Sequence, residues 1–217
     1  MVGSRRIGVA GALAAGFLVV HHLGRTYGST RAERRAPMAG DFLVLRPQTT
    51  ATHAVTIPAP PEAVWPWLQQ VGWHRGGWYT ARWVDVLFFP DNLPSADHVL
   101  PDLQRLEVGD WVPDGPPETG CGFVVREVVP ERRLVLHSTT HLPPSWRRRG
   151  RTRITWTWSF ELHPVDGGRS TRLVFRWRAR TRPWWLTAGA HLVIVPADAV
   201  MSHDMLHGLR QRAGRAA

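Results

Sequence analysis

Two histidines lie one helical turn apart in the segment HDMLH, residues 203–207. Histidines at this spacing, with an acidic residue beside the first, are typical of a zinc-binding helix, here with Asp204 in the place of the usual glutamate. A zinc site needs a third protein ligand, and His191 is the one candidate that we find. Because His203 and His207 fall opposite the apolar stripe of the helix expected here, we predict that they face solvent and that the chain holds no metal.

Four other polar residues could exchange protons with a bound substrate, since each belongs to an element that could line an interior space: Tyr79, Arg82, Asp85 and His137. General acid–base catalysis requires such groups within hydrogen-bond reach of the reacting atoms. Their spacing does not show that they converge, and an ordinary hydrogen-bonded polar side chain is the alternative for each. The sequence therefore assigns no catalytic residue.

The motifs of several common enzyme classes do not occur in the sequence. The chain contains no G-x-x-x-x-G-K-[ST], G-x-G-x-x-G or G-x-S-x-G pattern, so nucleotide-binding and serine-hydrolase sites lack their usual geometry. Its single cysteine, Cys121, excludes an internal disulfide framework. Cys121 stands between two glycines without an evident histidine partner, which favours an ordinary thiol over a nucleophile.

Large rings occupy every second position in the segment WTWSF, residues 156–160. Side chains alternate across a strand, so the strands expected over residues 152–162 and 171–181 each carry rings on one face and polar residues, including arginines, on the other. An apolar sheet face must be covered by another element. The rings that share this face are Trp156, Trp158, Phe160, Phe175 and Trp177.

The order of the expected elements along the chain indicates an α+β domain. A strand over residues 50–57 leads into two short helices, which begin at Pro61 and near Tyr79. An irregular connection rich in Pro, Asp and Gly follows, and then strands joined by turns, so that neighbouring strands are antiparallel. A helix from Pro196 to about Arg212 ends the chain. The later strands are expected over residues 122–129, 134–140, 152–162 and 171–181.

The C-terminal helix is the available cover for the aromatic face. Its apolar stripe is expected to contain Ala197, Met201, Met205 and Leu209. Helix and sheet can interdigitate to native density, or the rings can hold the helix away and leave a cavity. Composition alone favours the filled core, and both arrangements remain open at this point.

An uncharged stretch of eighteen residues, 7–24, lies near the N-terminus between Arg6 and Arg25. As a helix it spans about 27 Å, slightly less than the ~30 Å hydrocarbon core of a bilayer. No A-x-A cleavage site follows, so we expect a retained membrane anchor rather than a signal peptide; a soluble helix is the alternative. Basic residues after the stretch outnumber those before it, which favours a cytoplasmic main domain. Residues 1–40 then form anchor and basic linker, and residues 41–213 the globular domain.

The formal net charge is +10, and all 27 basic residues are arginines. Alternation predicts a basic band on the outer sheet face. Single-stranded nucleic acid requires aromatic rings beside such cations, whereas here rings and cations lie on opposite faces, so nucleic acid is not expected. Anionic lipid is a better partner for the band, and the segment 182–195 could lie at the membrane interface or at the cavity entrance. The alternative is that the charged face is solvated and the segment forms a buried helix. The band comprises Arg147, Arg148, Arg149, Arg151, Arg153, Arg172, Arg176, Arg178, Arg180 and Arg182.

Five segments, in this order, resemble bacterial members of the START/polyketide cyclase (SRPBCC) superfamily: IPAPPEAVWPWLQQVG, GWYTARWVDVLF, LQRLEVGDWVP, TWSFELHPVDGGRSTRLVFRWRAR and MSHDMLHGLRQRA. The resemblance covers about residues 41–212 and leaves out the N-terminal stretch. It implies a helix-grip fold, in which a curved antiparallel sheet wraps a long C-terminal helix around a deep hydrophobic cavity. Members bind lipids, sterols, polyketides or other apolar molecules, and a minority catalyse cyclisation or dehydration.

We therefore expect the chain to bind, or to bind and transport, a hydrophobic small molecule or lipid in an interior cavity, at a membrane surface and without a cofactor. A polyketide cyclase or dehydratase that uses the same cavity is the alternative, and an interaction module with a filled interior is a third. The residues expected to line the cavity are Tyr79, Trp83, His137, Trp156, Trp158, Phe160, Phe175, Trp177, Met201 and Met205.

Overall fold

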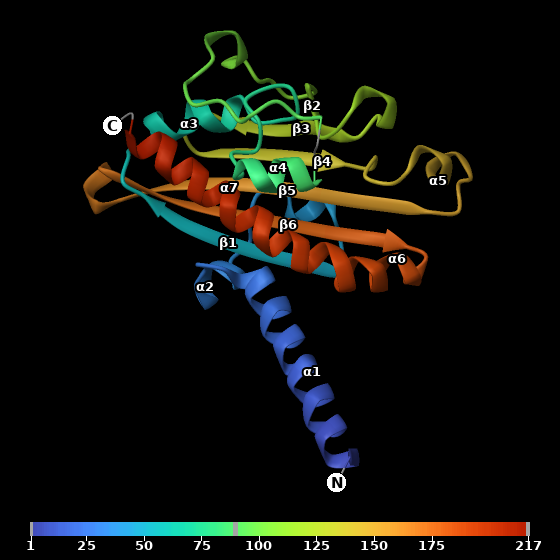
Figure 1. Cartoon of the computed structure of the whole chain (residues 1–217). Coiled ribbons are helices and arrows are strands. Elements are labelled where there is room, and N and C mark those ends of the chain that lie inside the picture. The colour runs from blue at the N-terminus through green and yellow to red at the C-terminus, as the bar shows by residue number, and fades with distance from the viewer. Residues whose placement is uncertain (1, 89–90, 216–217) are drawn as a thin grey trace.

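A computed structural model of the chain describes residues 2–88 and 91–215. In this part of the chain six strands form one antiparallel sheet in the order β1-β6-β5-β4-β3-β2, and the long helix α7 lies across one face of it (Figure 1). The strands are β1 Thr49–Ile57, β2 Trp111–Pro113, β3 Gly122–Val129, β4 Arg133–Ser138, β5 Arg153–Val165 and β6 Ser170–Arg182. The helices are α1 Val2–Thr26, α2 Arg31–Arg35, α3 Pro61–Gln69, α4 Arg82–Phe88, α5 Pro144–Arg148, α6 Trp184–Gly189 and α7 Val195–Arg215, with a π-helical turn, η5, at Ala190–Ile194. Short 3-10 turns lie at Asp41–Leu43, Pro101–Leu103, Pro117–Thr119 and Asp166–Gly168.

The predicted α+β class and helix-grip architecture are confirmed: a curved, open antiparallel sheet is covered by a long C-terminal helix. Each strand expected from residue 122 onward lies within a few residues of an observed one. Two details differ. The C-terminal helix begins earlier than Pro196, because α6, η5 and α7 follow one another without a break. The helix expected near Tyr79 begins only at Arg82, because Tyr79 has a left-handed backbone with φ of 61° and cannot continue a helix.

The buried face of α7 is rotated relative to the predicted stripe. Ala197 and Met201 are only half-buried, whereas Met205 and Leu209 are buried as expected. Polar residues take part in this face, because Asp198 and Ser202 are buried beside its apolar residues. Close approach also requires Gly208, where any Cβ would collide with the carbonyl oxygen of Tyr79. The helix therefore brings a carboxylate and a hydroxyl to the inner face of the sheet.

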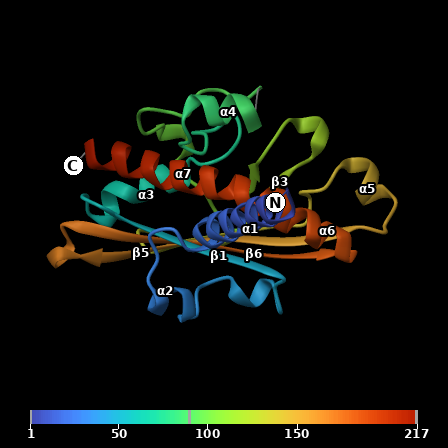
Figure 2. The same cartoon turned by 60° about the horizontal axis from the view of Figure 1, so that its bottom comes forward.

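The outer face of the sheet is covered by residues 28–46, which we call the strap. Figure 2 shows α2, part of the strap, on the side of the sheet opposite α7. The buried guanidinium of Arg176 donates to the carbonyl oxygens of Glu33 at 2.7 Å and Ala36 at 2.8 Å, and to the Asp41 carboxylate at 3.0 Å. Arg178 donates to the Asp41 carbonyl at 2.7 Å.

The predicted basic band on the outer sheet face is therefore not available to an outside partner in the middle of β6, because the strap covers it there. The arginines do lie on the face opposite the rings, as alternation predicts. However, the strap supplies carboxylates and carbonyls to Arg172, Arg176 and Arg178, and a buried guanidinium requires such partners. The exposed arginines that remain lie at one end of β5 and β6 and in the preceding loop.

Helix α1 leaves the sheet beside β1 and projects away from the body of the domain (Figure 1). Its last turns are packed against α7: a Cβ on Gly24 would lie 2.9 Å from the Cβ of Ala199, and the rings of Tyr27 and His203 are 4.6 Å apart. Farther from the domain, Phe17, Leu18 and Val19 are exposed. The anchor role of residues 7–24 stays a prediction. Among the described residues, the helical stretch that is long and apolar enough to cross a membrane is Trp184–Arg215, which contains the helix packed on the sheet.

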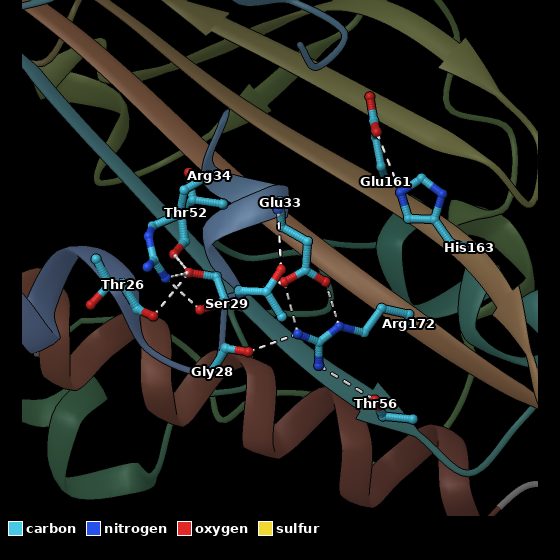
Figure 3. Close-up of polar contacts among 11 residues, drawn as sticks. Thr26, Gly28, Ser29, Glu33, Arg34, Thr52, Thr56, Glu161, His163 and Arg172 are labelled. Carbon is cyan, nitrogen blue, oxygen red and sulfur yellow. Dashed lines mark hydrogen bonds and ion pairs between the residues drawn. The ribbon is translucent and has the colours of Figure 1, made fainter. Parts of the chain in front are cut away.

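An ion pair joins the strap to β6 (Figure 3). Arg172 donates to both carboxylate oxygens of Glu33, at 2.7 and 3.0 Å, and to the carbonyl oxygen of Gly28 at 2.7 Å. Glu33 also accepts from the backbone N–H of Thr30 at 2.6 Å, in a capping box at the start of α2. These contacts lower the pKa of Glu33 from 4.5 to about 2, chiefly through the hydrogen bond from Arg172.

We predict that the Glu33→Gln substitution lowers the free energy of unfolding at pH 7 by about 1 kcal/mol, because glutamine can keep the capping box but not the charge. A depressed carboxyl pKa stabilises the fold above pH 4.5, and this contribution is lost as the pH falls toward 2. The difference from the wild type should therefore shrink over that range in urea unfolding of the full chain. The exposed Glu118 is the control, since Glu118→Gln should have little effect at any pH. An undiminished difference at pH 2.5 contradicts the ion-pair interpretation.

Candidate functional site

The aromatic residues of β5 and β6 lie on the face of the sheet that α7 covers. Across the strands, Trp158 is opposite both Leu136 and Trp177, and Phe160 is opposite both Leu134 and Phe175. Residues directly opposite one another share a face. All of these side chains are buried. Trp156 is the next residue on this face toward the start of β5. It is half-buried and lies opposite Ser138.

Around Phe160 and Phe175 the interior is filled by rings. These two rings stack with centroids 4.7 Å apart, and the centroid of Trp158 lies 5.2 Å from that of Phe175. The rings of Trp78 and Phe123 also lie near that of Trp158, with centroids 4.9 and 5.1 Å away. Two surface hollows lie elsewhere. One, of about 360 Å³, lies beside the end of α7, and the other, of about 750 Å³, lies beside the turn between β3 and β4.

Three tryptophans of this cluster have an indole N–H without a hydrogen-bond partner in the described part of the chain: Trp78, Trp156 and Trp158. The ring of Trp158 lies 4.9 Å from that of Trp78 and 5.6 Å from that of Trp156. A buried donor without a partner costs about 1–3 kcal/mol, and native interiors contain few of them. Trp67 and Trp73 share this property outside the cluster. A hydrogen-bond acceptor that reached any of these N–H groups would remove that cost.

A buried histidine and carboxylate face the same interior from β1 and α7. His53 is fully buried, and both of its ring nitrogens lack a hydrogen-bond partner in the described chain. Its Nε2 lies 3.5 Å from Oδ2 of Asp198. That oxygen accepts from Trp177 Nε1 at 2.6 Å, and Oδ1 of Asp198 accepts from the Ser202 hydroxyl at 3.0 Å. Because His53 is opposite Phe175 in the sheet, it points to the aromatic side. A ring nitrogen of His53 therefore remains available to an interior ligand.

A second polar group, formed by His141 and its partners, lies beside Trp156. His141 Nε2 lies 2.8 Å from a carboxylate oxygen of Asp114, and His141 Nδ1 lies 2.7 Å from the hydroxyl of Ser138. The carboxylate only accepts, so His141 Nε2 donates to Asp114. The imidazole lies 4.7 Å from the ring of Trp156. Both nitrogens are engaged, so His141 mainly ties the loops after β2 and β4 to the sheet.

Two residues expected to line the cavity do not face the interior. Trp83 is 60% exposed on α4, because the helix that carries it begins after Tyr79 and presents this side to solvent. His137 lies on the outer face, opposite Val124 and Thr157, because its neighbours Leu136 and Ser138 take the inner positions. Both expectations are therefore wrong. Burial and the nearby Arg126 lower the pKa of His137, but on that face the imidazole cannot reach the rings.

The other proton-exchange candidates also lie apart from the ring cluster. The Tyr79 hydroxyl donates to the carbonyl oxygen of Trp67 at 2.6 Å, and burial raises its pKa above the ordinary value. Asp85 accepts a hydrogen bond from Thr80, and its pKa is raised mainly by burial. Arg82 is exposed. These residues have structural partners and do not converge with His137.

The remaining chemical candidates have simple environments. Burial raises the pKa of Cys121 to about 12, so its thiol stays protonated at neutral pH, as the prediction of an ordinary thiol requires. His203 and His207 are exposed on α7, as predicted. In the described residues no group of three potential metal ligands comes together. His191 instead lies between His21 and Thr49, at 3.1 Å from each.

Sequence reasoning missed His53, Asp198, Ser202 and Trp78. A usable signal existed for the two helix residues. Asp198 and Ser202 are one turn apart and continue through Met205 and Leu209 with helical period, so a polar pair belongs to the buried stripe. His53 shares the inner face of its strand with Ala51 and Val55, as the period of two predicts. Trp78 lies in an irregular segment, where no periodicity predicts its direction.

Comparisons with known proteins assign the chain to no family. No family model and no curated protein sequence matches it. Among solved structures, hypothetical protein jhp0584 from Helicobacter pylori is 11% identical with a TM-score of 0.46, and the match covers 82% of this chain and 94% of that one. Protein MLL2253 from Mesorhizobium loti is 18% identical with a TM-score of 0.38, covering 78% and 99%. DynU16, described as a protein in the dynemicin biosynthetic locus, is 15% identical with a TM-score of 0.36, covering 73% of this chain and 46% of that one. At these TM-scores the likenesses carry no argument, and the superfamily assignment stays a prediction.

Proposed function

We propose that the chain is a membrane-anchored member of the SRPBCC superfamily that binds a hydrophobic small molecule between the inner sheet face and α7. The helix-grip architecture and the order of the five sequence segments support the superfamily assignment. In this proposal residues 41–213 form the binding domain, while α1 inserts in the membrane and leaves the domain on the cytoplasmic side. The strap fixes the domain to α1.

The observation that carries the proposal is the set of unpaired donors around Trp158. A purely structural core would pair or exclude them, since each unpaired group lowers stability. A ligand with an apolar body and oxygen acceptors, such as an aromatic ketone, quinone or ester, would contact the rings and accept from the indole N–H groups of Trp78, Trp156 and Trp158. The free ring nitrogen of His53 would recognise a further polar group. Recognition of this kind, few polar groups in an aromatic setting, is typical of small-molecule sites.

The first turns of the covering helix are suited to admit such a molecule. The π-helical turn η5, at Ala190–Ile194, directly precedes α7. Such turns occur mostly as short irregularities and frequently at functional sites. Asp198 and Ser202, on the first turns of α7, lie over Trp177. A small displacement of α7 at η5 would open the space over Trp156 and Trp177 while the packed rings of Phe160 and Phe175 stay in place.

We predict that the Trp158→Phe substitution lowers the amount of small molecule that copurifies with the full chain by about tenfold, because phenylalanine keeps a ring but removes one donor worth about 1–1.5 kcal/mol. Native mass spectrometry of protein from the same cells measures the bound mass. The thermal stability of the ligand-free variant should change little. Removing an unpaired N–H stabilises the fold, and this offsets the loss of some buried ring area.

The matched control is Trp83→Phe, which changes the exposed Trp83 on α4 and should leave retention unaltered. Equal retention by the wild type, Trp158→Phe and Trp83→Phe shows that the indole donor is not used. The absence of any bound mass from the wild type counts against interior binding altogether.

A second candidate function is favoured by the polar pair of His53 and Asp198. An all-apolar lining would indicate binding alone, whereas here an imidazole with free nitrogens faces the rings and lies 3.5 Å from a buried carboxylate. In a cyclase or dehydratase, His53 would remove a proton from the carbon beside a carbonyl and return it, and Asp198 would hold the resulting imidazolium. The indole donors would stabilise the enolate oxygen.

This candidate predicts that the chain accelerates exchange of the α protons of 1-tetralone, an aromatic ketone, in D₂O. Proton nuclear magnetic resonance follows the loss of the α-proton signal. A positioned general base accelerates such a reaction by about 10²–10⁴-fold. His53→Leu and Asp198→Asn should each remove this acceleration, whereas His163→Gln, on the outer face of β5, should not. Exchange at the buffer rate with the wild type contradicts the enzymatic candidate and leaves binding as the function.

A further inference from the structure

An apolar surface is exposed where the chain passes from β6 into α7. Trp184 on α6 is 78% exposed, and Leu192 and Val193 on η5 are 64% and 63% exposed. Trp185 and Ile194 are also exposed. We call these five residues the interfacial patch. Contiguous apolar surface of this kind on a soluble domain usually marks a site of protein or membrane contact, and tryptophan beside aliphatic residues is typical of the bilayer interface.

Exposed arginines lie next to this patch. Arg153 and Arg182 are directly opposite in the pairing of β5 with β6, and like charges at opposite positions destabilise a sheet unless an anion compensates them. No ion pair in the described part of the chain involves either residue or their neighbours in the preceding loop. The T-shaped contact of Trp146, on α5, with Trp185, 5.3 Å between centroids, joins the segment before β5 to α6. The arginine cluster comprises Arg148, Arg149, Arg151, Arg153 and Arg182.

Helix α1 emerges beside the same surface. His21 of α1 contacts His191 of η5 at 3.1 Å, and His191 contacts Thr49 of β1 at 3.1 Å. The strap and the packing of Gly24 against Ala199 fix the direction of the helix. The contacts of His21, Gly24 and Tyr27 with His191, Ala199 and His203 place the end of α1 along η5 and the first half of α7. A bilayer that surrounds the residues before His21 would therefore meet the interfacial patch.

We propose that the interfacial patch lies in the headgroup region of an anionic bilayer that α1 enters, with the arginine cluster on the lipid phosphates. The proposal rests on the proposed anchor role of α1. Guanidinium groups bind phosphate oxygens in pairs, and a negatively charged leaflet attracts such a cluster. Since η5 continues into α7, the membrane contacts the helix that covers the interior. The ligand then enters from the lipid phase, through the end of the sheet nearest Trp156 and Trp177.

Spin labels on the full chain test this arrangement. In a Cys121→Ser background, a nitroxide is attached at Leu192→Cys in the patch, at Leu18→Cys in α1 and at Val108→Cys before β2. Val108 matches Leu192 in exposure, at 64%, but lies next to the sheet edge opposite β1. Vesicles contain phosphatidylcholine and phosphatidylglycerol, and power saturation compares collisions with oxygen, which partitions into lipid, and with a water-soluble nickel chelate.

We expect labels at 18 and 192 to collide mainly with oxygen and the label at 108 mainly with the chelate. The Arg148→Gln/Arg149→Gln/Arg151→Gln variant, and vesicles of phosphatidylcholine alone, should shift the label at 192 toward water at least severalfold. A lipid-exposed label at 18 with an aqueous label at 192 overturns the docking proposal and keeps the anchor. Aqueous labels at both positions overturn both, while copurification of a small molecule still decides interior binding. Insensitivity to lipid charge and to the arginine substitutions overturns the role of the cluster.

Discussion

The antiparallel pairing of β5 with β6 determines where most side chains of functional interest lie. Thirteen residues of each strand are paired in one register, and alternation then separates rings from arginines along the whole length. Trp158 and Trp177 consequently face α7, while Arg176 faces the strap. The same pairing that makes an aromatic interior thus makes the attachment surface for the segment that leads to α1. A slip of one residue would exchange the two faces and abolish both.

Periodicity predicted what depends on a regular repeat. The α+β class follows from the order of the expected elements, and the helix-grip architecture follows from the resemblance. Alternation gives the inner position of Trp156, Trp158, Phe160, Phe175 and Trp177. Features made by irregular backbone could not be predicted. Tyr79 adopts a left-handed conformation that displaces α4 and exposes Trp83, and the strap partners of Arg172 and Arg176 lie about 140 residues away in the chain. His137 was misplaced for a simpler reason, since parity within its strand assigns it to the outer face.

The interior differs from an ordinary hydrophobic core in the polar groups that it buries. Around Phe160 the rings fill the space, as composition suggests, whereas toward Trp156 and Trp177 the lining includes unpaired indole donors, an imidazole and a carboxylate. In the proposed arrangement these groups lie under the first turns of α7, and the preceding helical turns rest on the bilayer. Ligand recognition and membrane contact would then involve different parts of one continuous helix, from Trp184 to Arg215.

The central claim is that the unpaired indole N–H groups receive an acceptor from an interior ligand. The most direct measurement is the ¹H–¹⁵N spectrum of the tryptophan indoles during titration with 1-tetralone, with signals assigned by tryptophan-to-phenylalanine substitutions. We predict saturable downfield shifts of the indole protons of Trp78, Trp156 and Trp158, as expected when a donor gains a carbonyl partner, and no shift for the exposed Trp83. Unmoved signals from the three buried indoles, or equal movement of all indoles, would contradict the account.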